Sequence, residues 1–157
     1  MFTKKALTGL LCCALLIQTL SCKNAADSPA DAAALLTAMP QWRIDEILVN
    51  DAVTMKDGKM TQHFGGIEFE RYMETVELNK NGTFSGIFKG DTKPFELKWK
   101  QNDSNITVGA ATGDNKGGEW TIDPKDVSKE FFTMRTQSTA YDYPRMTKIS
   151  LKFKAAK

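Results

Sequence analysis

FELKWK, at residues 95–100, alternates strictly between apolar and charged side chains. Phe95, Leu97 and Trp99 share one phase, and the glutamate and lysines between them share the other. Successive side chains of a β-strand point to opposite faces, so this alternation predicts a strand with one buried face and one solvated face. The fold of the whole chain follows from how far this period extends.

The period of two continues on both sides of this stretch, from about residue 41 nearly to the C-terminus. Turns rich in Gly, Asn and Asp separate the alternating segments, of which there are about eight or nine, and no long helix lies between them. Such spacing is typical of an antiparallel meander, which closes into a barrel or folds into a sandwich. We predict an all-β fold, an antiparallel up-and-down barrel of about eight strands, because closure removes exposed strand edges.

Two local signals refine the first strands of this barrel. Trp42 and Ile44 share one phase, but the apolar residues that follow lie in the opposite phase, which predicts a bulge near Glu46. Asp57-Gly58 separates two short segments, and both residue types tolerate the positive φ of a type I′ turn. The sequence therefore predicts a hairpin at residues 57–58.

A short helix is predicted before the strands. Ser28 can cap it, Pro29 suits its first position, and Asp31 stands three residues after Ser28 in a capping-box arrangement. One apolar stripe at helical spacing follows, formed by Ala32, Leu35, Leu36 and Met39. Pro40 ends the helix, which we expect to pack against the barrel.

The N-terminus has the pattern of an export signal. Lys4 and Lys5 precede an apolar run over residues 6–16, which is too short to remain as a membrane-spanning helix. The run is followed by LSC at residues 20–22, where a small residue precedes a cysteine. This pattern predicts cleavage before Cys22.

Residues 20–22 resemble the lipobox of bacterial lipoproteins, in which the cysteine is acylated and becomes the new N-terminus. The chain departs from the usual pattern at Thr19, where the family prefers a large aliphatic residue. The resemblance implies a lipid on Cys22 and a location in the bacterial cell envelope, anchored to the outer membrane. An ordinary secretory signal that leaves a free Cys22 is the alternative.

The expected organisation has three parts. Residues 1–21 form a lipoprotein signal peptide, residues 22–39 form the lipid anchor, tether and short helix, and residues 40–157 form the barrel. Loss of residues 1–21 removes two lysines, so the formal charge of +2 falls to zero. A neutral chain with scattered charges has no electrostatic footprint for nucleic acid, and anchoring to the membrane must come from the lipid.

Cysteine chemistry is not expected in the folded domain. Cys12 and Cys13 lie in the signal peptide and Cys22 is the acyl acceptor, which uses all three cysteines of the chain. The mature domain therefore has neither a disulfide nor a thiolate nucleophile.

A broader resemblance covers residues 42–153. Trp42 near the start of the first strand, NGTF at residues 81–84, a strand bearing Trp99, and Asn-rich turns leading to Ile106 resemble the lipocalin-like lipoproteins of Bacteroidetes. Pro40 stands where true lipocalins have glycine, two residues before the tryptophan. The resemblance implies an eight-stranded up-and-down barrel with an apolar interior, and it implies no catalytic residues.

Catalytic and metal-ligating residues are sparse. His63 is the single histidine, so no histidine pair can bind zinc and no Ser-His dyad can form without it. No helix pattern follows the glycines at residues 65–66, which are expected to form a turn rather than a phosphate loop. Neither residues 103–105 nor residues 114–115 have the ligand density of a calcium loop. We expect no metal, no cofactor and no enzymatic activity, although carboxylate chemistry is not excluded.

Glu74 shares the phase of Tyr72, Val76 and Leu78, which is expected to point inward. An unpaired carboxylate inside a barrel is costly. One hypothesis is that Glu74 anchors a polar group of a ligand, and the alternative is that it lies at an exposed rim.

Eight aromatic residues lie largely on the inward phase: Trp42, Tyr72, Phe84, Phe88, Phe95, Trp99, Trp120 and Phe132. In a small barrel such side chains either fill the interior or line a cavity for one apolar ligand. With Glu74 in place of Phe95, they form the predicted ligand-binding set. Tyr141 and Tyr143, before Pro144, are predicted to contact a partner at the rim, and a plain turn with partly buried tyrosines is the alternative.

The leading functional hypothesis is a membrane-anchored, non-enzymatic barrel that binds a small apolar ligand or an envelope component. The alternative is a packed-barrel structural or assembly subunit of the envelope that acts through protein contacts. An enzyme is the third hypothesis, and it would require two close inward carboxylates at a cleft.

Overall fold

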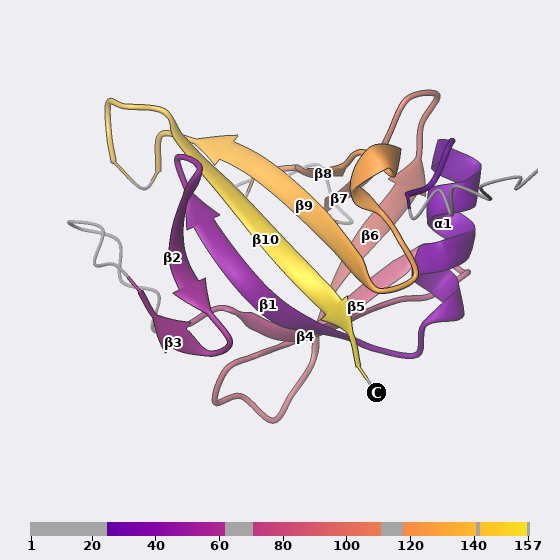
Figure 1. Cartoon of the computed structure of the whole chain (residues 1–157), viewed down its shortest axis with the longest axis horizontal. Helices are drawn as coiled ribbons and strands as arrows, with labels where there is room; N and C mark the ends of the chain where they lie inside the picture. The colour runs from indigo at the N-terminus through magenta and orange to yellow at the C-terminus, as the bar shows by residue number, and fades with distance from the viewer. Residues whose placement is uncertain (1–24, 62–70, 111–117, 141, 157) are drawn as a thin grey trace, which may run out of the picture.

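The computed structural model describes residues 25–61, 71–110, 118–140 and 142–156. These residues form an α-helix, a 3₁₀ helix and ten strands (Figure 1). The helices are α1 (Pro29–Ala38) and η1 (Pro124–Asp126). The strands are β1 (Trp42–Val49), β2 (Ala52–Lys56), β3 (Lys59–Met60), β4 (Met73–Leu78), β5 (Thr83–Phe88), β6 (Phe95–Gln101), β7 (Ile106–Gly109), β8 (Trp120–Ile122), β9 (Phe131–Ser138) and β10 (Thr147–Ala155).

The strands form a closed antiparallel barrel. From β4 to β10 each strand pairs with the next, and β1 closes the ring by pairing with both β10 and β4, which makes eight strands. This confirms the predicted all-β barrel. The hairpin of β2 and β3 is attached outside the ring, because β1 pairs with β4 at Trp42 and Arg43 and with β2 only from Glu46 onward.

The predicted bulge and hairpin are both present. The register between β1 and β10 shifts between Ile44 and Glu46. Two successive side chains, Asp45 and Glu46, therefore both point to the outside of the barrel, called here the outer wall. There they pair with Lys154 and Lys152. Asp57 and Gly58 have φ values of 49° and 75°, as a type I′ turn requires. Both features follow from local sequence signals.

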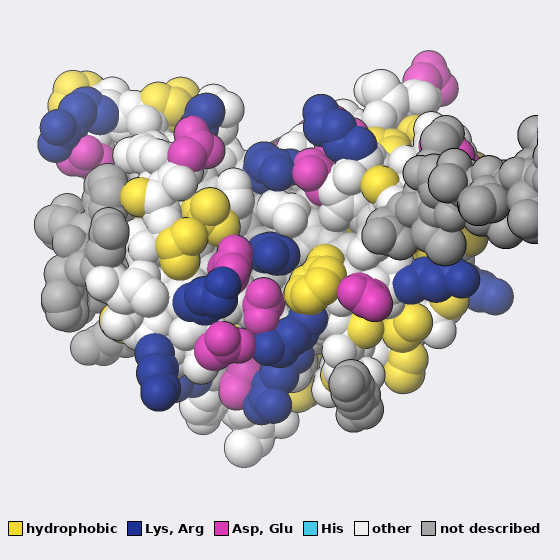
Figure 2. Space-filling model, viewed as in Figure 1, with side chains coloured by type: hydrophobic (Ala, Val, Ile, Leu, Met, Phe, Trp, Pro, Cys, Tyr) yellow, Lys and Arg dark blue, Asp and Glu magenta, His cyan; other side chains and the backbone are white. Residues whose placement is uncertain are grey.

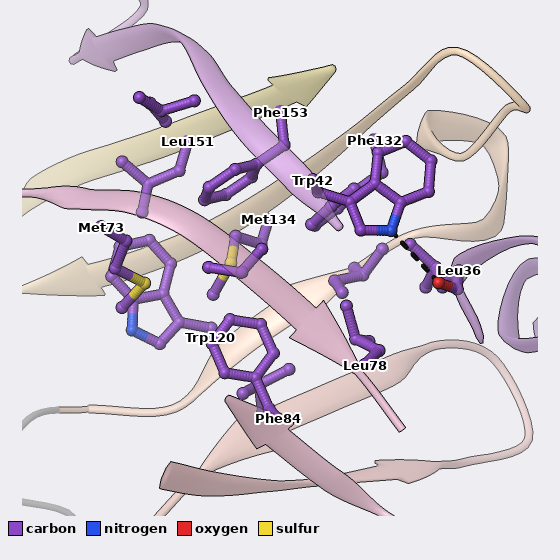
Figure 3. Close-up of a cluster of buried hydrophobic side chains, with 14 of the residues drawn as sticks. Leu36, Trp42, Met73, Leu78, Phe84, Trp120, Phe132, Met134, Leu151 and Phe153 are labelled. Carbon is purple, nitrogen blue, oxygen red and sulfur yellow. Dashed lines mark hydrogen bonds between the residues drawn. The ribbon is translucent and has the colours of Figure 1, made fainter. Parts of the chain in front are cut away.

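The helix α1 covers one end of the barrel. Ser28 caps it as predicted, since its Oγ accepts a hydrogen bond from the backbone N–H of Asp31 at 3.1 Å. Leu36 is fully buried, and its carbonyl oxygen accepts a hydrogen bond from Nε1 of Trp42 at 3.1 Å (Figure 3). The bond ties the helix to the first strand, so α1 acts as a plug. Within the described part of the chain, no helix is long and apolar enough to cross a membrane.

The core fills the space between the plug and the middle of the barrel. Phe84, Trp120 and Met134 come from three different strands and belong to one buried cluster (Figure 3). Phe84 and Met134 are fully buried, and Trp120 is 8% exposed. The alternation of side chains along the strands therefore places large apolar residues in a common interior, as the pattern of residues 95–100 predicts.

Candidate functional site

The two ends of the barrel are covered by different elements. We call the end where β1 begins and β4 finishes the helix end. It carries α1, the turn at residues 79–82 and η1. The opposite end, called here the loop end, carries the connection at residues 89–94 and the described part of the β9–β10 connection. Residues 62–70 and 111–117 lie outside the described residues.

One side of the interior is tightly filled. The packed half, as we define it, consists of the inward apolar side chains of β1, β9 and β10, namely Trp42, Ile44, Ile47, Val49, Phe132, Met134, Ile149, Leu151 and Phe153. All nine are buried. Trp42 meets Phe132 edge to face with ring centroids 5.0 Å apart, and Phe132 stacks on Phe153 at 4.9 Å. Aromatic rings in these arrangements leave little space for a guest molecule.

The opposite side is less completely covered. The β5–β6 row, as we define it, consists of Phe88, Phe95, Leu97 and Trp99. These residues share the inward phase and pack against the core, yet each remains partly exposed. Met73 and Trp120, on neighbouring parts of the barrel, are 9% and 8% exposed. Apolar surface that water still reaches on these side chains is the kind of surface that an apolar ligand covers.

An aromatic column rises along this row toward the loop end. The ring of Phe84 lies 6.4 Å from that of Phe95, and Phe95 stacks on Phe88 with centroids 4.4 Å apart. A Cβ added to Gly86 would lie only 2.6 Å from Cζ of Phe95, so glycine provides the space in which that ring lies. The column ends at Arg71, whose guanidinium carbon lies 4.5 Å from the centroid of Phe88.

Arg71 is a site residue that sequence reasoning missed. It stands two residues before β4, and its Nη2 donates a hydrogen bond to Oδ2 of Asp91 at 2.7 Å. Arg71 lies outside the alternating pattern of the strands, so hydrophobic periodicity does not identify it. Its contact with Phe88 depends on how β4 pairs with β5. Phe95 belonged to the predicted inward aromatics, and Gly86 stands between two others, Phe84 and Phe88, on the same strand phase.

The structure divides the predicted ligand-binding set. Trp42, Phe84, Phe132 and Trp120 are buried within the core. Phe88 and Trp99 belong to the β5–β6 row, and Nε1 of Trp99 donates to the carbonyl oxygen of Asn79 at 2.8 Å. Of the remaining two predicted residues, Tyr72 is 8% exposed and belongs to the buried cluster, and Glu74 lies at the surface.

Glu74 does not share the face of Val76, contrary to the predicted phase. The register between β4 and β5 shifts between Met73 and Thr75, and this bulge has no phase break in the sequence to reveal it. Tyr72 and Glu74 instead line an outer hollow of about 310 Å³. Glu74 lies 3.5 Å from Nη2 of Arg43, so its carboxylate is paired at the surface.

An ion-pair network covers the outer wall beside this hollow. Lys154 donates to Asp45 at 2.8 Å and to Asp57 at 2.9 Å, which fastens the β2–β3 turn to β1 and β10. The hydrogen bond from Lys154 lowers the pKa of Asp57, and the bond from Lys56 lowers the pKa of Glu46. Figure 2 shows acidic and basic side chains interleaved over this face. The wall is balanced in charge and presents no single-sign field here.

A second outer hollow, of about 400 Å³, lies beside η1. Its lining residues are Asn105, Thr121, Asp123, Lys125, Asp126 and Arg135. Arg135 pairs with Asp126, and a hydrogen bond from Lys125 lowers the pKa of Asp123. The charges in the hollow therefore satisfy one another. Over the described ranges, no group of three His, Cys, Asp or Glu side chains could hold a metal ion.

The β9–β10 connection presents exposed apolar side chains. Tyr143 is 85% exposed and Met146 is 57% exposed. Tyr143 therefore does not form the partly buried turn that was the alternative. Three residues that the sequence singled out, Cys22, His63 and Tyr141, lie outside the described residues, as do residues 65–66 and 114–115.

Comparisons with known proteins identify no family. A scan against protein-family models found no match, and a search of curated proteins found none. Among solved structures the chain is similar to the bovine lipocalin allergen Bos d 2, at 15% identity and a TM-score of 0.44 over 79% of this chain and 75% of that one.

It is also similar to bovine odorant-binding protein in complex with a selenium-containing odorant, at 17% identity and a TM-score of 0.45 over 78% and 73% of the two chains. A deswapped triple mutant of bovine odorant-binding protein matches at 16% identity and a TM-score of 0.42 over 75% and 73%. The barrel assignment rests on the strand pairing of this chain itself.

Proposed function

We propose that the protein is a non-enzymatic binding protein that takes up a small apolar ligand along its β5–β6 row from the loop end. The observation that carries this proposal is the contrast inside the barrel. The packed half is buried throughout, whereas the inward residues Phe88, Phe95, Leu97 and Trp99 keep partly exposed apolar surface. Covering such surface contributes roughly 25 cal/mol per Å² of apolar area to the free energy of binding.

The test is binding of the uncharged fluorescent probe N-phenyl-1-naphthylamine to the purified protein, with native mass spectrometry of the same sample. We expect the probe to bind, and Phe88→Ala to weaken it severalfold. Phe131→Ala is the matched control, because Phe131 lies on the outer phase of β9 and is 36% exposed. Absence of probe binding and of any small-molecule adduct would overturn the proposal.

We also propose that the chain is a lipoprotein of the bacterial envelope, of the type found in Bacteroidetes, anchored to the outer membrane by a lipid on Cys22. The support is the sequence of residues 1–22, with its basic start, short apolar run and small residue before the cysteine. A Cys22→Ala precursor is expected to leave the membrane fraction. Undiminished membrane partitioning of that variant would contradict the anchor.

A second function is favoured by the β9–β10 connection. Tyr143 and Met146 expose apolar surface at the loop end, and such residues are enriched where proteins meet partners. If the barrel acts as an envelope assembly subunit, a photocrosslinking residue at position 143 forms a discrete adduct in intact cells. The same residue at Lys93, an exposed lysine of the β5–β6 connection, is the control.

A further inference from the structure

The aromatic column ends in a cation, and this arrangement bears on the class of ligand. Phe95, Phe88 and Arg71 follow one another along the aromatic column: the rings of Phe95 and Phe88 have centroids 4.4 Å apart, and the guanidinium carbon of Arg71 lies 4.5 Å from the centroid of Phe88. The inner part of the column is apolar, and its outer end is positively charged. A molecule lying against Phe95 and Phe88 would therefore have one end beside the guanidinium of Arg71.

Arg71 retains hydrogen-bonding capacity at this position. Its guanidinium carries five N–H donors, and within the described residues only Asp91 accepts from it. The Arg71 side chain is 65% exposed, and the carboxylate of Asp91 is itself partly exposed. An exposed pair of this kind is weak, so a second carboxylate can share or replace Asp91.

Three other cations near the loop end are directed elsewhere. Lys89 lies 5.3 Å above the ring of Tyr72, which lines the outer hollow. Lys148 pairs with Asp51, and Arg145 pairs with Asp142. Arg71 is thus the cation that the described contacts join to the column.

We infer that the ligand is a single-chain amphiphile with an anionic carboxylate end, whose chain lies on Phe88 and Phe95 and whose carboxylate is bound by Arg71. The inference rests on the proposed function and names the ligand class of the same site. Arg71 acts here as a specificity-determining residue, because an uncharged chain of equal length makes the apolar contacts but not the charge-assisted hydrogen bonds.

The experiment measures displacement of N-phenyl-1-naphthylamine from the full-length chain by dodecanoate and by dodecan-1-ol. We expect Arg71→Gln to weaken dodecanoate about tenfold and to leave dodecan-1-ol unchanged. Arg43→Gln is the matched control, because Arg43 is similarly exposed and paired with a carboxylate on the outer wall, and it should change neither ligand.

A second variant tests the same inference from the opposite side. Asp91→Asn removes the competing carboxylate and is expected to tighten dodecanoate binding severalfold without affecting dodecan-1-ol. Equal weakening of both ligands by Arg71→Gln, or no effect of either variant on dodecanoate, would overturn the inference while leaving the proposed function standing. Failure of the wild-type chain to bind the probe or either ligand would instead overturn the proposed function.

Discussion

The packed half and the β5–β6 row are built from the same kinds of side chain, yet they are buried to different extents. Phe132 and Phe153 in the packed half are fully buried, whereas Phe88 and Phe95 in the row are not, although all four lie on the inward phase of their strands. The plug α1 is hydrogen-bonded to β1 through Trp42, and it also contacts β4 and β6. Strand phase thus decides which side chains point inward, and the neighbouring elements decide how completely each is covered.

The largest expected effect is in the packed half. Phe132→Ala removes a ring that contacts both Trp42 and Phe153, and we expect the free energy of unfolding to fall by about 3–5 kcal/mol. Urea denaturation followed by tryptophan fluorescence measures it. If Phe132→Ala lowers the free energy of unfolding no more than Phe88→Ala does, the packed half is not more tightly packed than the β5–β6 row.

Two leucines allow the same substitution in both regions. Leu151, in the packed half, is 6% exposed, and Leu97, in the row, is partly exposed. We expect Leu151→Ala to cost about 2–4 kcal/mol of unfolding free energy and Leu97→Ala about 1 kcal/mol, because less surface and less cavity are involved in the row. Parallel urea titrations compare them, and equal costs would contradict the assignment of Leu97 to a less filled region.

Gly86→Ala tests whether the space beside Gly86 is needed for the ring of Phe95. The new Cβ would lie 2.6 Å from Cζ of Phe95, so we expect a cost of about 1–2 kcal/mol and weaker probe binding. In a Phe95→Leu background the clash disappears, and the cost of Gly86→Ala should fall. An unchanged cost in that background would show that the backbone of Thr75, rather than Phe95, limits the space at Gly86.

The smallest effect concerns the outer wall behind the packed half. The pKa of Asp57 in the folded protein lies below its ordinary value of 3.8, because Lys154 donates a hydrogen bond to it. The stability from this pair is therefore present above pH 3.8 and is lost as the pH falls through the lower folded-state value. We expect Asp57→Asn to reduce slightly the difference in urea midpoint between pH 7 and pH 3.

That comparison has a matched control in Glu74→Gln, which removes a carboxylate paired at 3.5 Å on the same wall without touching Lys154. A larger effect of Glu74→Gln than of Asp57→Asn on the pH dependence would show that the network around Lys154 is not the main contributor.

Much of this architecture could be predicted because the deciding signals are local. FELKWK, the change of phase before Glu46, the Asp57-Gly58 turn and the Ser28 cap each depend on residues within a few positions of one another. The bulge after Met73 could not be predicted, because the side chains on both of its sides continue a plausible alternation, and so the sequence predicts an inward Glu74.

The candidate site was only partly predictable for a related reason. Which inward aromatics are covered depends on the plug and on cross-strand neighbours, such as Gly86 opposite Phe95. The contact between Arg71 and Phe88 likewise joins residues that are brought together by strand pairing. A sequence pattern predicts which face of a strand a side chain occupies. It does not predict which residue of the neighbouring strand lies opposite, and these contacts depend on that register.

The two outermost described segments of the chain are both fastened at the helix end. The N–H of Ala26 donates to the carbonyl oxygen of Val127 at 2.8 Å, and the N–H of Ala156 donates to that of Gln41 at 3.0 Å. In Figure 1 the C-terminus accordingly emerges on the same side of the barrel as α1. A fusion partner, affinity tag or sensor surface joined through either segment would therefore attach at the helix end, which leaves Arg71 and the column beneath it at the opposite end of the barrel.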